Sequence, residues 1–191
     1  MSVFAIVLVA TLLVIAVYAV MIFNSLVQVK HNVSKAWANI DVLLKQRHDE
    51  IPKLVEVCKQ YRDFEQATLQ RVIEARSRVF QASQTQNMAA LGQAETALRA
   101  GLANLFAVAE AYPDLKTNEQ FLNLQTRISA LENAIADRRE FYNESVNINN
   151  VRIEQFPDTI VARMFDFPPR QLLEFQDTEK RDVDVKKLFA A

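Results

Sequence analysis

Length, composition and charge exclude several classes of protein at the outset. The chain has 191 residues, a formal net charge of −1, two glycines, five prolines and one cysteine. A near-neutral chain has no electrostatic reason to bind nucleic acid, and a single cysteine cannot form an intramolecular disulfide. Glycine and proline are far rarer than their average usage of about 7% and 5%, which favours long helices over sheets and turn-rich loops.

The first element is an apolar stretch from Val3 to Phe23 that contains no charged residue. At about 1.5 Å per residue a helix of this length spans roughly 32 Å, enough to cross a hydrocarbon core of about 30 Å. The stretch predicts a transmembrane anchor over residues 1–23. A cleaved signal peptide is the alternative, with Val17 and Ala19 before the cut, but the stretch is longer than usual and no basic segment precedes it.

Basic residues predict the orientation of this anchor. No Lys or Arg precedes the stretch, whereas Lys30 and Lys35 lie just after it. By the positive-inside rule, the N-terminus faces outward and the following domain is cytoplasmic.

A long helix is expected to leave the membrane, because neither glycine nor proline occurs between Val3 and Ile51. Its apolar residues recur every three or four positions: Leu26, Val29, Val33, Trp37, Ile40 and Leu44. Such a stripe packs on another helix, and Trp37 is the expected anchor of that packing. Pro52 is expected to bend or break the helix at the Ile51-Pro52 bond.

Three further helices are expected to complete a bundle over residues 24–156. The second begins at Pro52 and carries Cys58 on its apolar face, and a polar loop follows over residues 81–87. The third covers residues 88–112, with a seven-residue apolar pattern that Glu95 interrupts and with Gly92 and Gly101 suited to close helix approach. Tyr112-Pro113 ends it.

The fourth helix follows a turn over residues 113–116, with Thr117 and Gln120 in the spacing of a capping box. It runs to Gln155 with a regular apolar row, in which Arg138 takes the place of an apolar residue. A buried Arg138 would need an acidic partner on a facing helix.

Residues 157–191 form a clasp rich in Phe and Pro, followed by a charged tail. A short helix is expected between Asp158 and Phe165, too short to span a membrane. Packing on the bundle is favoured over lipid contact, because Asp166 and Arg170 interrupt the apolar surface. The tail over residues 179–187 is typical of a flexible segment, unless a neighbouring subunit holds it.

The chain resembles the LemA family of bacterial membrane proteins over most of its length. The signature is carried by residues 111–116 with Asn118, by residues 121–125, and by matching positions over residues 37–55 and 132–146. The chain departs from the family at 149–150, Asn-Asn in place of Tyr-Asn, and at 166–167, Asp-Phe in place of Gly-Phe. The resemblance implies an inner-membrane anchor with a short exterior N-terminus, a cytoplasmic antiparallel helical bundle and no established enzymatic activity.

The residues of this pattern, Arg138 of the fourth helix and the aromatic residues of the clasp are candidates for structural or interaction roles. They are Trp37, Pro52, Tyr112, Pro113, Asp114, Asn118, Arg138, Tyr142, Asn143, Phe156 and Phe167.

No residue pattern predicts a catalytic, cofactor or metal site. His31 and His48 lack the spacing of zinc ligands and are expected on the solvated surface. Cys58 lies on an apolar face, where a thiol is inert. The pair Asp49-Glu50 is expected to face solvent, and two glycines cannot build a phosphate-binding loop.

Three functions remain open in the sequence. The favoured one is a membrane-anchored scaffold that self-associates through its long helices and could organise or shape the membrane, with the lipid bilayer and further copies of itself as partners. The alternative is an adaptor that binds another membrane protein or a membrane protease. An enzyme is the least favoured.

Overall fold

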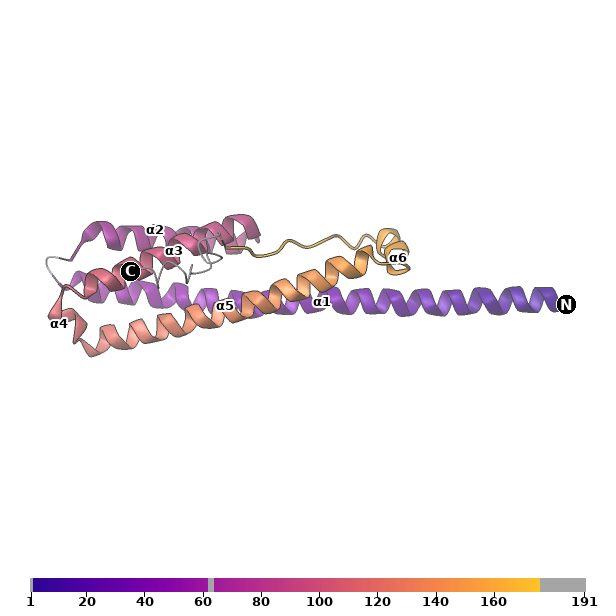
Figure 1. The fold of residues 1–191 in the computed structure, drawn as a ribbon, viewed down its shortest axis with the longest axis horizontal. Helices are drawn as coiled ribbons and strands as arrows, with labels where there is room; N and C mark the ends of the chain where they lie inside the picture. The colour runs from indigo at the N-terminus through magenta and orange to yellow at the C-terminus, as the bar shows by residue number, and fades with distance from the viewer. Residues whose placement is uncertain (1, 62–63, 176–191) are drawn as a thin grey trace, which may run out of the picture. The chain divides into compact units, whose positions relative to one another are not determined.

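The computed structural model describes residues 2–61 and 64–175. The regular elements in these ranges are α1 (Val3–Lys59), α2 (Gln66–Gln84), α3 (Met88–Ala109), α4 (Pro113–Lys116), α5 (Glu119–Glu154) and α6 (Asp158–Met164) (Figure 1). All of them are helices, which confirms the all-α prediction.

The chain divides into two compact units, and α1 and α5 each contribute residues to both. Unit 1 consists of residues 1–43 and 133–172. Unit 2 consists of residues 44–132 and 173–191.

Unit 1 pairs α1 with the second part of α5 in antiparallel directions. Near one end of the pair, Arg152 Nη2 donates to Ser25 Oγ at 2.9 Å. Further along, the rings of Trp37 and Tyr142 meet edge to face, with centroids 6.0 Å apart. The predicted stripe of α1 is confirmed, because its members Leu26, Val33 and Ile40 are buried.

The short helix α6 packs on α1 within unit 1. Val161 and Ala162 form a buried apolar cluster with Ile22 and Leu26 of α1, and Phe23, Ile153 and Phe167 surround it. The predicted helix between residues 158 and 165 is therefore confirmed. Figure 1 shows α6 beside α1 at the point from which α1 continues alone to the N-terminus.

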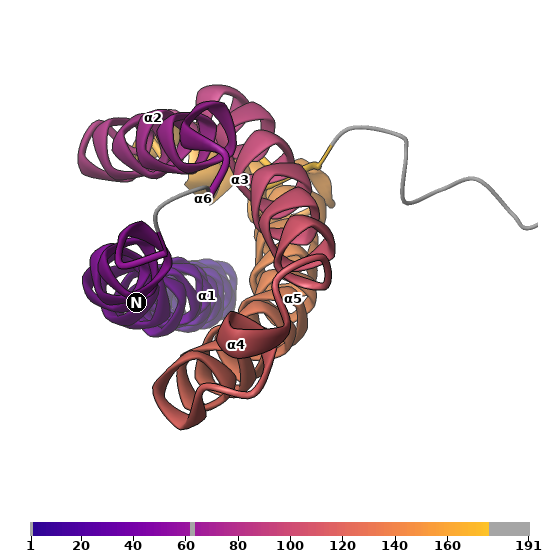
Figure 2. The ribbon, with the colours of Figure 1, turned by 90° about the vertical axis from the view of Figure 1, so that its left-hand side faces the viewer.

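Unit 2 is built around the antiparallel pair of α2 and α3. Asn104 Nδ2 donates to Thr68 Oγ1 at 3.1 Å, and a Cβ at Gly101 would lie 3.4 Å from Val72 Cγ2. The predicted apolar row of α3 is buried: Met88, Leu91, Leu98, Leu102, Leu105 and Ala109. Figure 2 looks onto the end of this unit where α4 joins α3 to α5.

Helix α1 continues through Pro52 to Lys59, so the predicted break at Ile51-Pro52 is wrong. Proline has no N–H, which leaves the carbonyl of His48, four residues earlier, without its helical donor. Arg76 of α2 supplies the missing donor, because its Nε lies 2.8 Å from His48 O. The helix tolerates the proline because a side chain from another helix satisfies the freed carbonyl.

The helix expected from Pro52 into the region of Val79 is divided instead. After Lys59 the backbone turns more tightly than an α-helix, because Gln60 N donates to Val57 O and Tyr61 N donates to Cys58 O, each three residues earlier. Phe64 is then buried, with its ring centroid 5.2 Å from that of Tyr112.

Two other local predictions need correction. The helix before the polar loop extends to Gln84, and the loop is shorter than residues 81–87. Asn118, not Thr117, caps α5, because Phe121 N donates to Asn118 Oδ1 at 3.0 Å. The hydroxyl of Thr117 donates to Pro113 O in α4, so it does not form the predicted capping box.

Arg138 is exposed, so the structure contradicts its placement in the buried row of α5. The buried row passes from Ile135 to Tyr142, and the half-buried position between them is Arg139. A straight helix has 3.6 residues per turn and drifts from a strict seven-residue repeat, which turns residue 138 outward. The charged tail over residues 179–187 lies outside the described residues.

Candidate functional site

A buried charge cluster joins α1, α3 and α5 in the interior of unit 2. Arg47 pairs through Nη2 with Glu95 Oε1 and through Nη1 with Glu132 Oε1. Arg99 Nε lies 3.2 Å from Glu132 Oε2 at the edge of the cluster. Arg47 is 1% exposed and Glu95 is 2% exposed, so both ionic groups are removed from water.

Helical periodicity puts these charges inside. Arg47 comes three residues after Leu44 and four before Ile51, in the buried row of α1. Glu95 stands in the corresponding place in α3, between Leu91 and Leu98. Glu95 was recognisable in the sequence as an interruption of an apolar row, whereas Arg47 was missed. The signal that could have identified the pair was a charged residue at an apolar position on each of two helices.

The buried environment and the neighbouring charges shift the pKa values of both Arg47 and Glu95. Burial disfavours the charge of Arg47, but Glu95 and Glu132 outweigh it, so the pKa of Arg47 is raised. Burial also raises the pKa of Glu95, while the charge of Arg47 opposes that shift. Both terminal nitrogens of Arg47 are engaged by carboxylates, and separating the pair would leave a buried charge uncompensated.

A second acidic group is also buried, so the prediction that Asp49-Glu50 faces solvent is wrong for Glu50. Its Oε1 lies 2.6 Å from Arg127 Nη2 and 3.0 Å from Lys53 Nζ. Asp49 is exposed as predicted.

His48 is half-buried and is not the solvated histidine that the sequence predicts. Its Nε2 lies 2.6 Å from Arg76 Nη2, and its ring stacks on Phe80 with centroids 4.7 Å apart. Burial and the charge of Arg76 lower the pKa of His48, against the opposing charge of Asp49. Neutral His48 thus accepts from the same arginine that satisfies its carbonyl.

The chain has one thiol, that of Cys58. Cys58 is buried, and burial raises the pKa of its thiol to about 12, so the nucleophilic thiolate does not form near neutral pH. Over residues 2–61 and 64–175, no group of three or more His, Cys, Asp or Glu side chains is placed to hold a metal ion.

The candidate residues around positions 112–118 form the corner between α3 and α5. Tyr112 caps α4, and Pro113 is its first residue. Tyr61 connects this corner to the end of α1, because its hydroxyl donates to Asp114 O at 3.2 Å and accepts from Asn118 Nδ2 at 3.3 Å. The corner residues thus act in holding helices together.

One protein family matches most of this chain. The model of the LemA family matches residues 36–186. The chain belongs to the LemA family. It is 26% identical to protein LemA of Metamycoplasma hominis over 167 residues, which cover 86% of this chain and 74% of that protein. Magnetosome proteins MamQ 1 and MamQ 2 of Paramagnetospirillum magneticum are each 26% identical over 88 residues, 46% of this chain and 32% of theirs.

The remaining candidates of this LemA chain lie in unit 1. Trp37 and Tyr142 are in contact, and the hydroxyl of Tyr142 donates to Gln171 O at 3.0 Å. Asn143 is half-buried. Phe167 packs against the α1–α6 cluster, whereas Phe156 is 81% exposed.

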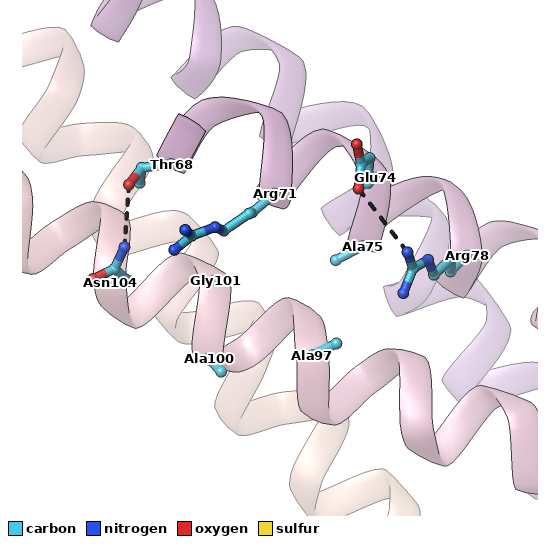
Figure 3. A pocket seen from close by; sticks show the side chains of 9 residues that line it. All are labelled: Thr68, Arg71, Glu74, Ala75, Arg78, Ala97, Ala100, Gly101 and Asn104. Atoms are coloured by element: carbon cyan, nitrogen blue, oxygen red, sulfur yellow. Dashed lines mark hydrogen bonds and ion pairs between the residues drawn. The ribbon is translucent and has the colours of Figure 1, made fainter. Parts of the chain in front are cut away.

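Between α2 and α3, this LemA chain has a groove of about 350 Å³ (Figure 3). Small residues line it, including Ala75, Ala97 and Gly101, and Arg71 and Arg78 stand along the α2 side. Glu74 Oε2 lies 3.9 Å from Arg78 Nη2. Thr68 also lines the groove, and its hydroxyl donates to Glu65 Oε2 at 2.9 Å.

A second groove, of about 470 Å³, lies between α1 and α5 in unit 1. Val29, Asn32, Lys35 and Asn39 line it from α1. Arg138, Phe141, Glu144, Ser145 and Ile148 line it from α5. Arg138 therefore contributes a surface charge beside exposed apolar side chains.

Proposed function

We propose that this LemA-family protein is a membrane-anchored scaffold that self-associates through unit 1. The anchor is the N-terminal part of α1, which is the one helix of the described residues long and apolar enough to cross a membrane. Its side chains from Val3 to Met21 are mostly exposed within the chain, unlike those of a core helix in a soluble protein. The bilayer is the environment that suits this surface.

The observation that carries self-association is an exposed apolar row on α5. Phe141 is 53% exposed, and Ile148, one heptad later, is exposed on the same side of the helix. Both line the unit 1 groove, and Val42 and Val151 add exposed apolar surface. A row of large apolar side chains beside a groove is typical of a protein interface.

The charges of the groove favour a second copy as the partner. Lys35 and Arg138 stand in the same groove as Glu144. In a two-fold arrangement each surface meets its own copy, so Glu144 of one chain can face the basic residues of the other.

The proposed orientation places the N-terminus outside the inner membrane and the helical bundle in the cytoplasm. Lys30, Lys35 and Lys45 follow the apolar stretch, and no basic residue precedes it. Anchored copies that associate side by side would organise the membrane around them.

The test is the oligomeric state of full-length protein extracted in mild detergent. Phe141→Glu places a charge in the proposed interface and should convert the oligomer to monomer or shift its midpoint concentration at least about tenfold, a cost of ~1.4 kcal/mol. Leu122→Glu is the matched control, because Leu122 is similarly exposed on the same helix but belongs to unit 2. A wild-type protein that is monomeric at cellular concentration, or equal effects of both substitutions, would contradict the proposal.

An adaptor is the second candidate function, favoured by the groove between α2 and α3. Its small residues leave room for a helix of another protein, and Arg71 and Arg78 would suit an acidic partner. Crosslinking in cells separates the two functions. An adaptor yields one dominant foreign partner that depends on Arg71, whereas a scaffold yields mainly its own multimers.

We do not propose an enzyme. In the described part of the chain, the thiol is buried and protonated, and the buried carboxylates are engaged by arginine or lysine.

A further inference from the structure

The short helix α6 has two faces of opposite environment. Val161 and Ala162 are buried against Ile22 and Leu26 of α1. Ile160 and Met164, four residues apart on the other face, are 53% and 72% exposed. The outward face of α6 therefore carries two large apolar side chains beside the exposed Arg163.

Phenylalanine residues lie next to both ends of the helix. Phe156 precedes α6 and is 81% exposed, and Phe165 follows it and is more than half exposed. Together with Ile160 and Met164 they make a set of four large apolar side chains, each more than half exposed, which we name the α6 patch. Moving such side chains out of water is favourable.

The position of the α6 patch along α1 indicates what covers it. The ring of Phe23, the last residue of the apolar stretch, lies 4.8 Å from the ring of Phe165 and 5.8 Å from that of Phe167. The α1 residues that α6 covers, Ile22 to Leu26, span only about 6 Å of helix. The patch thus lies beside the point where the apolar stretch ends.

Charged groups around α6 are arranged as at a lipid–water boundary. Asp158 lies 2.6 Å from Arg152 Nε and is turned inward. Lys30 Nζ stands 5.9 Å from the ring of Phe167, and Arg163 is exposed next to Met164. Basic side chains beside Phe and Met are typical of interfacial segments, where apolar groups enter the acyl region and the cations meet phosphate.

We propose that the α6 patch, Phe156, Ile160, Met164 and Phe165, inserts into the interfacial region of the leaflet where the apolar stretch of α1 ends. The inference rests on the proposed anchoring of α1. It reverses the sequence-based preference for packing the whole clasp on the bundle, because only one face of α6 is packed. Asp166 and Arg170, which argued against lipid contact, are exposed and would remain in headgroup water.

The insertion adds a second attachment of the chain to the bilayer. A single helix leaves a protein free to tilt and rotate about its axis. A patch held at the surface of the same leaflet fixes the side of unit 1 that faces the membrane, and so orients the α5 row for contact with neighbouring copies.

The test uses variants of full-length protein with one added cysteine each, in nanodiscs of phosphatidylcholine and phosphatidylglycerol. Met164→Cys, Leu13→Cys and Ser77→Cys each receive a fluorescent label, and all three positions are exposed. The buried Cys58 thiol is expected to stay unlabelled, and unsubstituted protein measures this background. Quenchers are aqueous iodide and lipids that carry a nitroxide near the headgroup or near the bilayer centre.

The label at residue 164 should be quenched by the shallow nitroxide, with an iodide quenching constant at least about twofold below that at residue 77. The label at residue 13 should respond to a nitroxide within the acyl region. If residue 13 responds to lipid but residue 164 matches residue 77, the interfacial insertion is overturned while the anchor stands. A residue 164 label shielded from both quenchers would assign the patch to protein contact, and a residue 13 label outside the lipid would overturn the anchor and the insertion together.

Discussion

Unit 2 encloses charged side chains, whereas unit 1 leaves large apolar side chains on its surface. In unit 2, Arg47 and Glu95 are almost fully buried, and the exposed large apolar residues of its described part are Ile73, Phe80 and Leu122. In unit 1, beyond the apolar stretch, the exposed set is Val42, Phe141, Ile148, Val151, Phe156, Ile160, Met164, Phe165 and Leu172. Beyond the apolar stretch, the large apolar side chains left on the surface of the described residues are thus concentrated in unit 1.

The contrast has a physical basis in what each interior specifies. A buried ion pair contributes little net stability but penalises every arrangement that separates its members, so it selects one packing of helices. Exposed apolar surface favours any contact that removes it from water. The first property suits a unit with fixed internal geometry, and the second suits the contacts with lipid and other copies that we propose for unit 1.

The largest expected effect comes from breaking the charge cluster of unit 2. Arg47→Ala leaves Glu95 buried without its cation and should lower the free energy of unfolding by ~3–5 kcal/mol. Chemical denaturation in detergent, followed by circular dichroism, measures it. Arg138→Ala removes an exposed arginine of unit 1 and should change stability by less than about 0.5 kcal/mol.

A compensating pair sharpens that result. Arg47→Met combined with Glu95→Leu replaces the pair by apolar groups of similar size and should recover most of the loss, since Glu132 keeps Arg99. Equal losses for Arg47→Ala and Arg138→Ala would remove the distinction between the two units.

The next effect tests how closely unit 2 is packed at its two glycines. A Cβ at Gly92 would overlap the carbonyl oxygen of Glu174. Gly92→Ala must therefore displace the segment over residues 173–175 and should cost about 1–3 kcal/mol. Faster hydrogen exchange in that segment is the direct readout.

Gly101→Ala is the matched control for Gly92→Ala. Its Cβ would meet only the Val72 side chain at 3.4 Å, and alanine favours the helix, so the change should be neutral or stabilising by up to about 1 kcal/mol. Equal destabilisation by both substitutions would show that helix contact, rather than residues 173–175, restricts Gly92.

A smaller effect is expected inside unit 1, where packing relies on aromatic residues. Tyr142→Phe keeps the ring against Trp37 but removes the hydrogen bond to Gln171 O, and should cost ~1 kcal/mol. Thermal unfolding in detergent measures the loss. Tyr18→Phe, on the exposed apolar stretch, should leave the midpoint unchanged, and a similar shift for both would argue against a specific role of the Tyr142 hydroxyl.

The smallest effect is a pH dependence that His48 gives to unit 2. The pKa of His48 lies below its ordinary value of 6.5 because of burial and Arg76, so the folded protein resists protonation. Above pH 6.5 neither the folded nor the unfolded state binds a proton at His48, and the free energy of unfolding keeps its full value. As the pH falls below it, the unfolded chain takes up a proton first and the free energy of unfolding decreases, by at most about 1.4 kcal/mol per pH unit.

Denaturation between pH 7.5 and 5.5 measures this slope. His48→Gln keeps a side chain that can accept from Arg76 but does not titrate, so it should flatten the curve. A slope unaffected by His48→Gln would assign the pH dependence to other groups.

Much of the fold could be predicted because its signals are local. The apolar stretch, the buried rows of α1 and α3, and the short α6 all follow from periodicity within single segments. The corner around Tyr112 and Asn118 was also visible as a pattern. Residues such as Arg138 were misplaced because a seven-residue repeat was extended further along α5 than its geometry allows.

The candidate surfaces were harder to predict, because exposure depends on neighbours distant in sequence. Phe156 and Phe167 look alike in the sequence, yet Phe167 packs near Phe23 and Phe156 is uncovered. His48 and Glu50 were assigned to solvent because their partners, Arg76 and Arg127, lie on other helices.

The sequence by itself determined that this protein is helical, that α1 begins with an apolar stretch able to cross a membrane, and which rows of each helix are apolar. Those properties depend on residues a few positions apart, within reach of one helical turn. Only the tertiary structure decided that Pro52 lies inside a helix, that Arg47 is the buried cation, and that one face of α6 is left bare. Each of these depends on which side chain from a distant part of the sequence lies nearby. A missing donor, a buried charge or an apolar face raises the free energy of the folded state until a partner satisfies it.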